Sequence, residues 1–229
     1  MSESLSSEVG RLVGLIVHDL RNPAATLGAN VEFLRDVGTP PPEDAVEDIR
    51  EALDDMRSAV VDLMRGFEQV SWLARWIAGE APTLRSDAEV APAVAGATSK
   101  FGMLRLRVES LPAGLRAKGG GALPKLLEIL LANSERHARH GEVIVRAYRD
   151  AAHIVVEVQD EGRSVGEDLR ATVFELEAQQ VIKTRPDGRY GRVAGLFAAK
   201  IVADAIGASL EADGADGSCI FRIRLISAT

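Results

Sequence analysis

His18 is the first residue whose type and neighbours could support chemistry. Asp19 follows it, and Leu20, two positions on, belongs to a repeating apolar pattern. Two positions correspond to about 200° around a helix, so we expect His18 to face solvent rather than the apolar side. An exposed imidazole offers a neutral ring nitrogen as a nucleophile near neutral pH, and Asp19 could accept the proton of the other ring nitrogen. A solvated surface histidine without a role is the competing interpretation.

A helix over residues 8–37 is predicted to position His18. Its apolar residues recur at alternating spacings of four and three, which is the pattern of a heptad seam. This first seam comprises Val13, Ile16 or Val17, Leu20, Ala24, Leu27, Val31 and Leu34. Gly38 suits the residue after a helix, the prolines at 40–42 cannot continue one, and a second helix is predicted over residues 43–78. The second seam comprises Val46, Ile49, Leu53, Met56, Val60, Leu63, Phe67 and Val70.

Two heptad helices joined by a short proline-rich turn predict an antiparallel helical hairpin. A single hairpin buries such seams poorly, so two copies are expected to form a four-helix bundle. The chain is therefore expected to be a homodimer. A coiled-coil spacer with no chemistry would explain the seams equally well.

The chain beyond the hairpin has a different pattern. Residues 78–83 predict a linker between a first domain at 1–79 and a second domain at 80–229. Helical patterns lie near 88–100, 123–138 and 196–206, and strand patterns lie near 104–108, 143–148, 153–158, 209–212 and 219–225. This order predicts an α+β sandwich, with one mixed sheet and helices on one face.

The string His18-Asp19-Leu20-Arg21-Asn22-Pro23 resembles the H-box of bacterial histidine kinases, whose usual form is His-Asp/Glu-Leu-Arg-Asn/Thr-Pro. The resemblance implies that His18 is the phosphoacceptor and that Asp19 is its acid–base partner. It also implies that Asn22 orients water when the protein acts as a phosphatase. Two consecutive heptad helices are the context in which this family carries its H-box.

Residues 130–138, Leu-Leu-Ala-Asn-Ser-Glu-Arg-His-Ala, resemble the N-box of the same family. The resemblance implies that Asn133 binds Mg²⁺ through its amide oxygen and that Arg136 and His137 face the nucleotide phosphates. Magnesium takes few protein ligands, so a single Asn can suffice. The family often has a second Asn one turn earlier, where this chain has Ile129. By itself the stretch would be a polar patch on an amphipathic helix.

Residues 158–165 resemble the G1 box, whose usual form is Asp-x-Gly-x-Gly. The resemblance implies that Asp160 accepts a hydrogen bond from the adenine amino group and that Gly162 lets the base lie close to the backbone. Ser164 replaces the second glycine. Residues 173–175, Val-Phe-Glu, match the short F-box. Taken alone, an Asp-Glu-Gly sequence after a strand is only a turn.

Residues 177–192 stand in the place of the family's ATP lid. This stretch contains a basic cluster suited to phosphates, although it could also be a solvated loop. The cluster comprises Lys183, Arg185, Arg189 and Arg192. Residues 191–196 stand where the family has Gly-x-Gly-Leu-Gly-Leu, so Gly191 and Gly195 are retained and Val193 replaces the middle glycine. Together the boxes imply a GHKL-type ATP-binding domain with ATP and Mg²⁺ as its cofactors.

Composition limits the other possibilities. The chain has 229 residues, a net charge of −7 and a pI near 5.2, which argues against nucleic acid as a partner. No apolar run reaches the roughly 18 residues of a membrane span, and no signal peptide is recognisable, so a cytoplasmic location is expected. Because only about eight polar residues precede the first helix, the input is expected from a separate sensor protein.

Two functions remain open from the sequence. The first is a sensorless cytoplasmic histidine kinase that autophosphorylates His18 from ATP and passes the phosphoryl group to an aspartate of a response-regulator receiver. The alternative is a histidine phosphotransfer protein that relays phosphate between receivers and whose degenerate second domain no longer binds ATP. Ile129 and Val193 favour the alternative. A purely structural scaffold gives no reason for the H-box.

Overall fold

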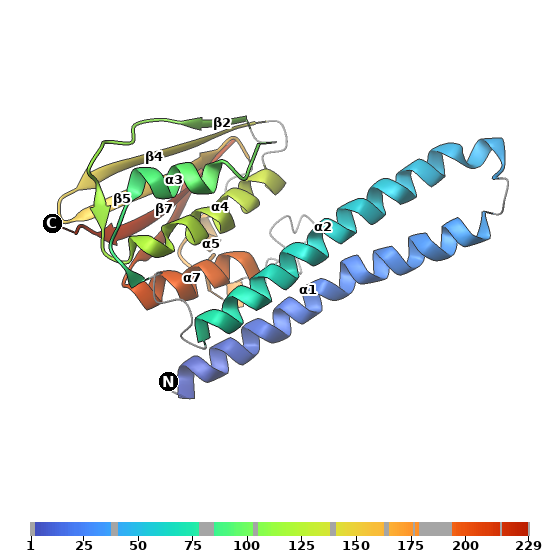
Figure 1. The fold of residues 1–229 in the computed structure, drawn as a ribbon, viewed down its shortest axis with the longest axis horizontal. Helices are drawn as coiled ribbons and strands as arrows, with labels where there is room; N and C mark the ends of the chain where they lie inside the picture. The colour runs from blue at the N-terminus through green and yellow to red at the C-terminus, as the bar shows by residue number, and fades with distance from the viewer. Residues whose placement is uncertain are drawn as a thin grey trace. The chain divides into compact units, whose positions relative to one another are not determined.

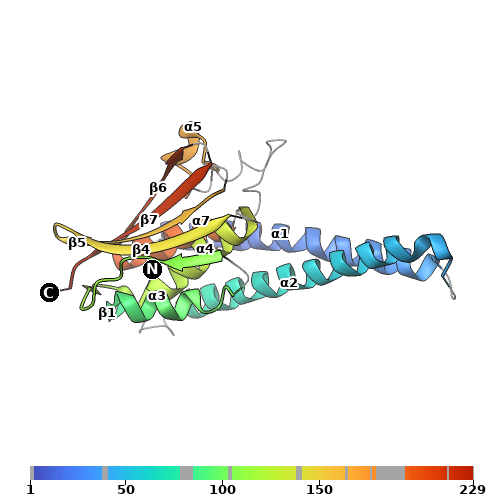
Figure 2. The ribbon, with the colours of Figure 1, turned by 90° about the horizontal axis from the view of Figure 1, so that it is seen from above.

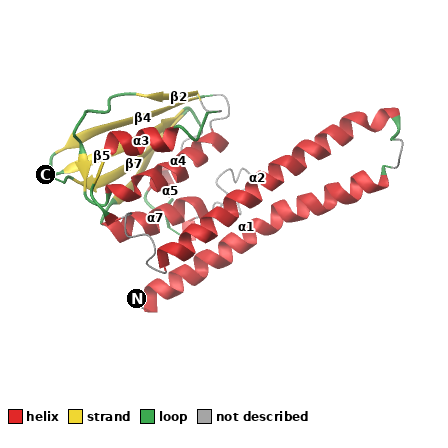
Figure 3. Cartoon of the chain, in the orientation of Figure 1, coloured by secondary structure: helices red, strands yellow, loops and turns green. Residues whose placement is uncertain are grey.

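The structure is a computed structural model, and it divides into two compact units, residues 1–80 and 81–229. It describes residues 3–37, 41–77, 85–102, 105–137, 141–162, 165–175, 177–178, 194–215 and 217–228. Helices and strands are coloured separately in Figure 3. Among the described residues, no helix is both long enough and apolar enough to cross a membrane.

The first unit is an antiparallel helical hairpin (Figure 1). Helix α1 runs over Glu3–Asp36, the short 3-10 helix η1 over Glu43–Ala45, and α2 over Val46–Ile77. Small residues let the two helices approach closely. A Cβ atom added at Gly66 would lie 2.3 Å from the Cδ2 atom of Leu20, which shows how tightly α2 packs against the turn that carries His18.

The hairpin buries only part of the predicted seams. The small side chains Ala52 and Ala59 are buried in α2, whereas a row with a seven-residue spacing on the same helix is 44–59% exposed. That row comprises Val46, Leu53, Val60 and Phe67. In α1, Val17 and Val31 are exposed at 48% and 52%. We call these six residues the exposed stripe.

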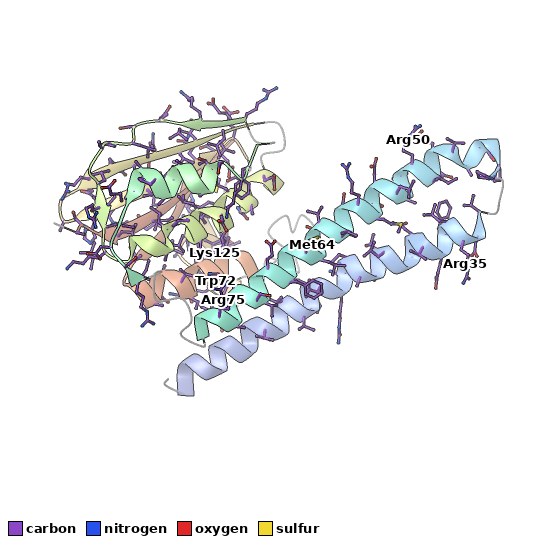
Figure 4. All side chains as sticks on the ribbon, in the orientation of Figure 1. Arg35, Arg50, Met64, Trp72, Arg75 and Lys125 are labelled. Carbon is purple, nitrogen blue, oxygen red and sulfur yellow. The ribbon has the colours of Figure 1, made fainter. Side chains whose placement is uncertain are left out.

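Figure 4 shows the charged side chains Arg35 and Arg50 pointing away from the opposite helix. Both are well exposed, and Arg50 pairs with Glu47 on the surface of α2. Met64, also labelled there, is 60% exposed on α2. The hairpin thus has a charged exterior, but it also leaves a large apolar surface uncovered within this chain.

The second unit has a five-stranded sheet in the order β2-β4-β5-β7-β6. Its strands are β2 Arg105–Val108, β4 Glu142–Asp150, β5 His153–Asp160, β6 Ser209–Ala215 and β7 Ser218–Ile226. The β2–β4 pair is parallel and the other pairs are antiparallel. The predicted mixed sheet is therefore confirmed.

Three helices lie on one face of this sheet (Figure 2). They are α3 Val90–Thr98, α4 Leu123–His137 and α7 Ala194–Ile206. The core between the layers is mostly aliphatic, and α4 contributes five leucines with no exposed surface. Alternate residues of β4, β5 and β7 face these leucines, so the helices and the sheet are held together by apolar burial.

Short elements absent from the sequence prediction fix the start of α4. Strands β1 Ala88–Glu89 and β3 Arg116–Ala117 form a separate two-stranded sheet, and η3 Gly120–Ala122 leads into the helix. Gly119 has a φ of +65°, and a Cβ added at Gly120 would lie 2.9 Å from the Ala88 carbonyl oxygen. These glycines therefore serve close packing at the beginning of α4.

Glu157 carries a buried charge on the sheet face opposite the helices. Its carboxylate accepts hydrogen bonds from Arg146, from Arg222 at 2.6 Å and from the Tyr148 hydroxyl at 3.1 Å. Burial alone raises the pKa of Glu157, but the hydrogen bonds from Arg222 and Arg146 outweigh it and leave the pKa below its ordinary value. The carboxylate thus ties β4, β5 and β7 together in its ionised form.

Replacing Glu157 with glutamine should lower the free energy of unfolding of the second unit by about 1–3 kcal/mol, because two arginines lose their shared anion. Since folding lowers the pKa of Glu157, this contribution is complete above the unfolded pKa, near 4.5, and disappears as pH falls further. Calorimetric unfolding should therefore show a larger difference between variant and wild type at pH 7 than at pH 3. Glu89→Gln, at a half-exposed pair with Arg116, is the control and should change little.

Candidate functional site

His18 lies on the exposed side of α1, as the seam predicted. Its side chain is 62% exposed, and its Nδ1 atom lies 3.6 Å from Oδ1 of Asp19, whose side chain is only 13% exposed. The carboxylate therefore sits beside one ring nitrogen. The other nitrogen, Nε2, is the atom left to act as a nucleophile.

The hydrogen bonding of α1 changes just after His18. Pro23 is inside α1 and cannot donate the backbone hydrogen bond that would reach the carbonyl of Asp19. Thr26 adds a side-chain hydrogen bond to the carbonyl of Asn22 at 3.2 Å. Asn22 itself is exposed, one helical turn after His18. The structure thus places His18, Asp19 and Asn22 within a single turn.

Asp160 ends β5 and is almost completely buried. It is 1% exposed, and its carboxylate has two donors. The Gly162 backbone N–H donates to Oδ1 at 2.9 Å, and the Ser134 hydroxyl donates to Oδ2 at 2.7 Å. Burial raises the pKa of Asp160 above its ordinary value, and the hydrogen bonds from Ser134 and Gly162 offset only part of that rise.

Ser134 is the site residue that sequence reasoning missed. The sequence alone suggests that it belongs to a polar face of the helix, two positions before Arg136, yet it is 0% exposed. The available signal was its place in α4, three and four residues after the buried Leu131 and Leu130. That spacing puts Ser134 on the core side of the helix.

The residues expected at the phosphates and the metal are only partly described. Asn133 is half-buried on α4, and the backbones of Arg136 and His137 form its last turn. Ile129, where the family often has a second Asn, is 6% exposed. A Cβ added at Gly195 would lie 3.8 Å from Cγ2 of Ile129, so this residue packs near the start of α7.

Asn133 is the remaining candidate for the magnesium ligand. Among the described residues, no three His, Cys, Asp or Glu side chains gather into a metal site. Ile129 has no ligand atom, so an ion on this face of α4 would take oxygen atoms from Asn133, from phosphates and from water.

The predicted F-box, residues 173–175, packs against the sheet and pairs with α7. Phe174 is buried and meets Phe221 edge to face, with ring centroids 5.9 Å apart. Glu175 lies 3.6 Å from the Lys200 ammonium on α7. The basic cluster and the neighbouring predicted residues lie outside the described part: Ser164, Lys183, Arg185, Arg189, Gly191, Arg192 and Val193.

A protein-family model described as histidine kinase-, DNA gyrase B-, and HSP90-like ATPase matches residues 121–228. The matched range includes Asn133, Asp160 and Gly195. Sensor protein KdpD of Clostridium acetobutylicum is 25% identical over 233 residues, covering 93% of this chain and 24% of that protein. The chain thus spans about a quarter of the length of this relative.

Solved structures of histidine kinases share the fold. Acinetobacter baumannii histidine kinase AdeS aligns with 93% of this chain and 98% of its own, with a TM-score of 0.61 and 15% identity. Histidine kinase ThkA, solved in complex with response regulator protein TrrA, aligns with 98% of this chain and 64% of its own, with a TM-score of 0.66 and 14% identity. At such identities the likeness concerns the fold, and its extent includes the hairpin.

Proposed function

Because residues 121–228 match the family model described as histidine kinase-, DNA gyrase B-, and HSP90-like ATPase, we propose that this chain transfers a phosphoryl group from ATP to His18. The observation that carries the proposal is a pair of sites in one chain. One is an exposed imidazole with a carboxylate beside its Nδ1 atom, and the other is a buried acceptor carboxylate in an ATPase-type domain.

The described residues fit the adenine end of ATP. In its ionised form Asp160 can accept hydrogen bonds from Ser134 and Gly162 and still offer a further acceptor to the adenine amino group. Gly162 is buried and carries no side chain that would separate the base from the backbone. The phosphates would lie towards the C-terminal turn of α4, where Arg136 and His137 supply positive charge or hydrogen-bond donors.

Magnesium fits the same site through Asn133, with its amide oxygen as the protein ligand. When bound, the ion would neutralise charge on the phosphates. The part played by this chain's own residues would be to bind and orient the phosphates, since positioning contributes much of the rate in phosphoryl transfer.

At His18 the reaction is a displacement at the γ-phosphorus. The Nε2 lone pair forms the new N–P bond, the bond from phosphorus to the bridging oxygen breaks, and ADP leaves with that electron pair. Asp19, 3.6 Å from Nδ1, is placed to take the Nδ1 proton as positive charge develops on the ring. Asn22 would orient a water molecule when the protein acts as a phosphatase.

The proposed acceptor of the phosphoryl group is an aspartate on a response-regulator receiver. The support is indirect: ThkA, whose fold this chain shares, was solved with a response regulator. The high exposure of His18 agrees with a nucleophile that must serve two partners in turn, first a nucleotide and then a protein.

One observation favours the relay alternative. Ile129 is buried beside the start of α7, so an apolar contact occupies the position where a second metal ligand is common in the family. In that alternative, His18 receives its phosphoryl group from a phosphorylated receiver, and the second unit binds no ATP.

Incubation of the purified chain with Mg²⁺ and ATP labelled at the γ-phosphate separates these functions. A kinase should acquire label that is acid-labile and alkali-stable, as phosphohistidine is. A relay should acquire none from ATP but should be labelled by a phosphorylated receiver. Absence of label under both conditions would contradict both functions.

We further propose that the chain is a homodimer through residues 8–78. The exposed stripe supports it, because a second hairpin would bury apolar residues that one hairpin leaves 44–59% exposed. Replacing Leu53 and Val60 together with lysine should give a monomer, since unpaired charges in the seam cost several kcal/mol. Light scattering at micromolar concentration is the measurement. Asp54→Lys, at an exposed polar position of the same helix, is the matched control and should remain dimeric, and a monomeric wild type would refute the proposal.

A further inference from the structure

Ser134 holds an unusual position for a serine inside a helix. A mid-helix serine commonly returns its hydroxyl to a carbonyl three or four residues earlier. Ser134, which is 0% exposed, instead donates to Oδ2 of Asp160 at 2.7 Å. The bond joins α4 to the end of β5 at the very residue proposed to contact the base.

This bond, together with that of Gly162, fixes the carboxylate of Asp160. Each of its two oxygens accepts one hydrogen bond: Oδ1 accepts from the Gly162 backbone N–H at 2.9 Å, and Oδ2 accepts from the Ser134 hydroxyl. A carboxylate has about four lone-pair positions, so each oxygen keeps one for a ligand. Both donors favour the ionised form, which can accept hydrogen bonds and cannot donate one.

We propose that Ser134 is a positioning residue that sets the base preference of the nucleotide site by holding Asp160 as a fixed acceptor. The inference rests on the proposed nucleotide-binding function. Adenine has an amino group at C6, which donates to such an acceptor. Hypoxanthine has a keto oxygen at that position, which is itself an acceptor and cannot form a hydrogen bond with the carboxylate.

Loss of the Ser134 hydroxyl should weaken this discrimination. Without it, Asp160 keeps a single donor, so its carboxylate can rotate or take up a proton. A protonated Asp160 can donate to the keto oxygen of hypoxanthine. The affinity for an adenine nucleotide should therefore fall, while the affinity for a hypoxanthine nucleotide stays constant or rises.

Calorimetric titration of the full chain with ADP and with IDP tests the inference. The wild type should prefer ADP by about tenfold or more, as expected for a site that requires a hydrogen-bond donor. Ser134→Ala should weaken ADP binding by about tenfold, equivalent to about 1.4 kcal/mol, and leave IDP binding unchanged or stronger. The ratio of the two affinities is the decisive readout, because a general loosening of the fold would lower both.

Two further variants keep the test decisive. Ser134→Cys fills the same space with a slightly larger side chain but donates only weakly, so it should lose discrimination even if the alanine variant fails to fold. Ser218→Ala removes another hydroxyl of the same unit, one that accepts from Gln159 at 3.3 Å, and should keep the wild-type ratio.

The outcomes separate the inference from the proposed function. A wild type that binds ADP, with Ser134 variants that keep the ADP-to-IDP ratio, would overturn the role of Ser134 and leave the nucleotide site standing. An equal loss for both nucleotides would also overturn it, since Ser134 would then be only a structural link. A wild type that binds neither nucleotide would overturn both.

Discussion

Replacing His18 with glutamine should remove phosphoryl acceptance completely. Glutamine is close in size and stays polar, and the side chain it replaces is 62% exposed, so no cavity forms and the hairpin should be unaffected. The variant lacks a ring nitrogen that can attack phosphorus, so the labelled product should fall to background, a loss of about a thousandfold or more when a nucleophile is removed.

The control for this experiment is His153→Gln, a half-buried histidine at the start of β5. It should be labelled like the wild type, and circular dichroism should show unchanged helix content for both variants. Label that persists on His18→Gln at wild-type levels would show that another residue accepts the phosphoryl group and that the H-box assignment is wrong.

Replacing Asp160 with asparagine should weaken ADP binding by about ten- to a hundredfold and, with it, ATP-dependent labelling. The reason is the loss of a charged acceptor, whose hydrogen bond is worth about 1.5–3 kcal/mol. The amide must also serve Gly162 and Ser134, which both donate in the wild type. The asparagine side chain has a single oxygen, which can replace only one of the two carboxylate oxygens. Its amide nitrogen takes the place of the other oxygen and should face Ser134 or the base. Binding of IDP should then suffer less than binding of ADP.

Calorimetry with each nucleotide measures this effect, and Glu161→Gln is the neighbouring control. Glu161 is exposed and accepts from the Glu142 backbone at 3.1 Å, so its replacement should leave the affinities nearly unchanged. If the histidine variant loses label while Asp160→Asn still binds ADP as the wild type does, the phosphoacceptor assignment would survive and the base-binding assignment would fail.

The long elements were predictable because their periods extend over many residues. The hairpin helices and strands β4, β5 and β7 lie where the alternation placed them, with ends shifted by a few residues. The resemblance to a histidine kinase core is confirmed for its ATPase-type part, where a family model matches residues 121–228. Strands β1 and β3 have two residues each, which are too few to show a period. They pair with each other although they are far apart in the sequence.

The seams and the buried site show where sequence patterns are insufficient. Spacings of three and four locate an apolar side, but they do not say which residues face the other helix of the hairpin and which form the exposed stripe. The G1 box identified Asp160 as a hydrogen-bond acceptor, but it did not identify Ser134 as a donor to Asp160. The two residues are 26 positions apart in the sequence, and their contact depends on how α4 packs on the sheet.

The two edges of the sheet bear on how copies of this chain can meet. Edge strands with free backbone groups invite pairing with another copy, and proteins discourage it with short strands and charged side chains. Here β2 has four residues and exposes Arg105 and Arg107, while β6 carries Glu211 and Asp213, and its Gly214 has a φ of +139°. Both edges of the second unit thus disfavour edge-to-edge pairing, so the proposed dimer would depend on the exposed stripe of the hairpin.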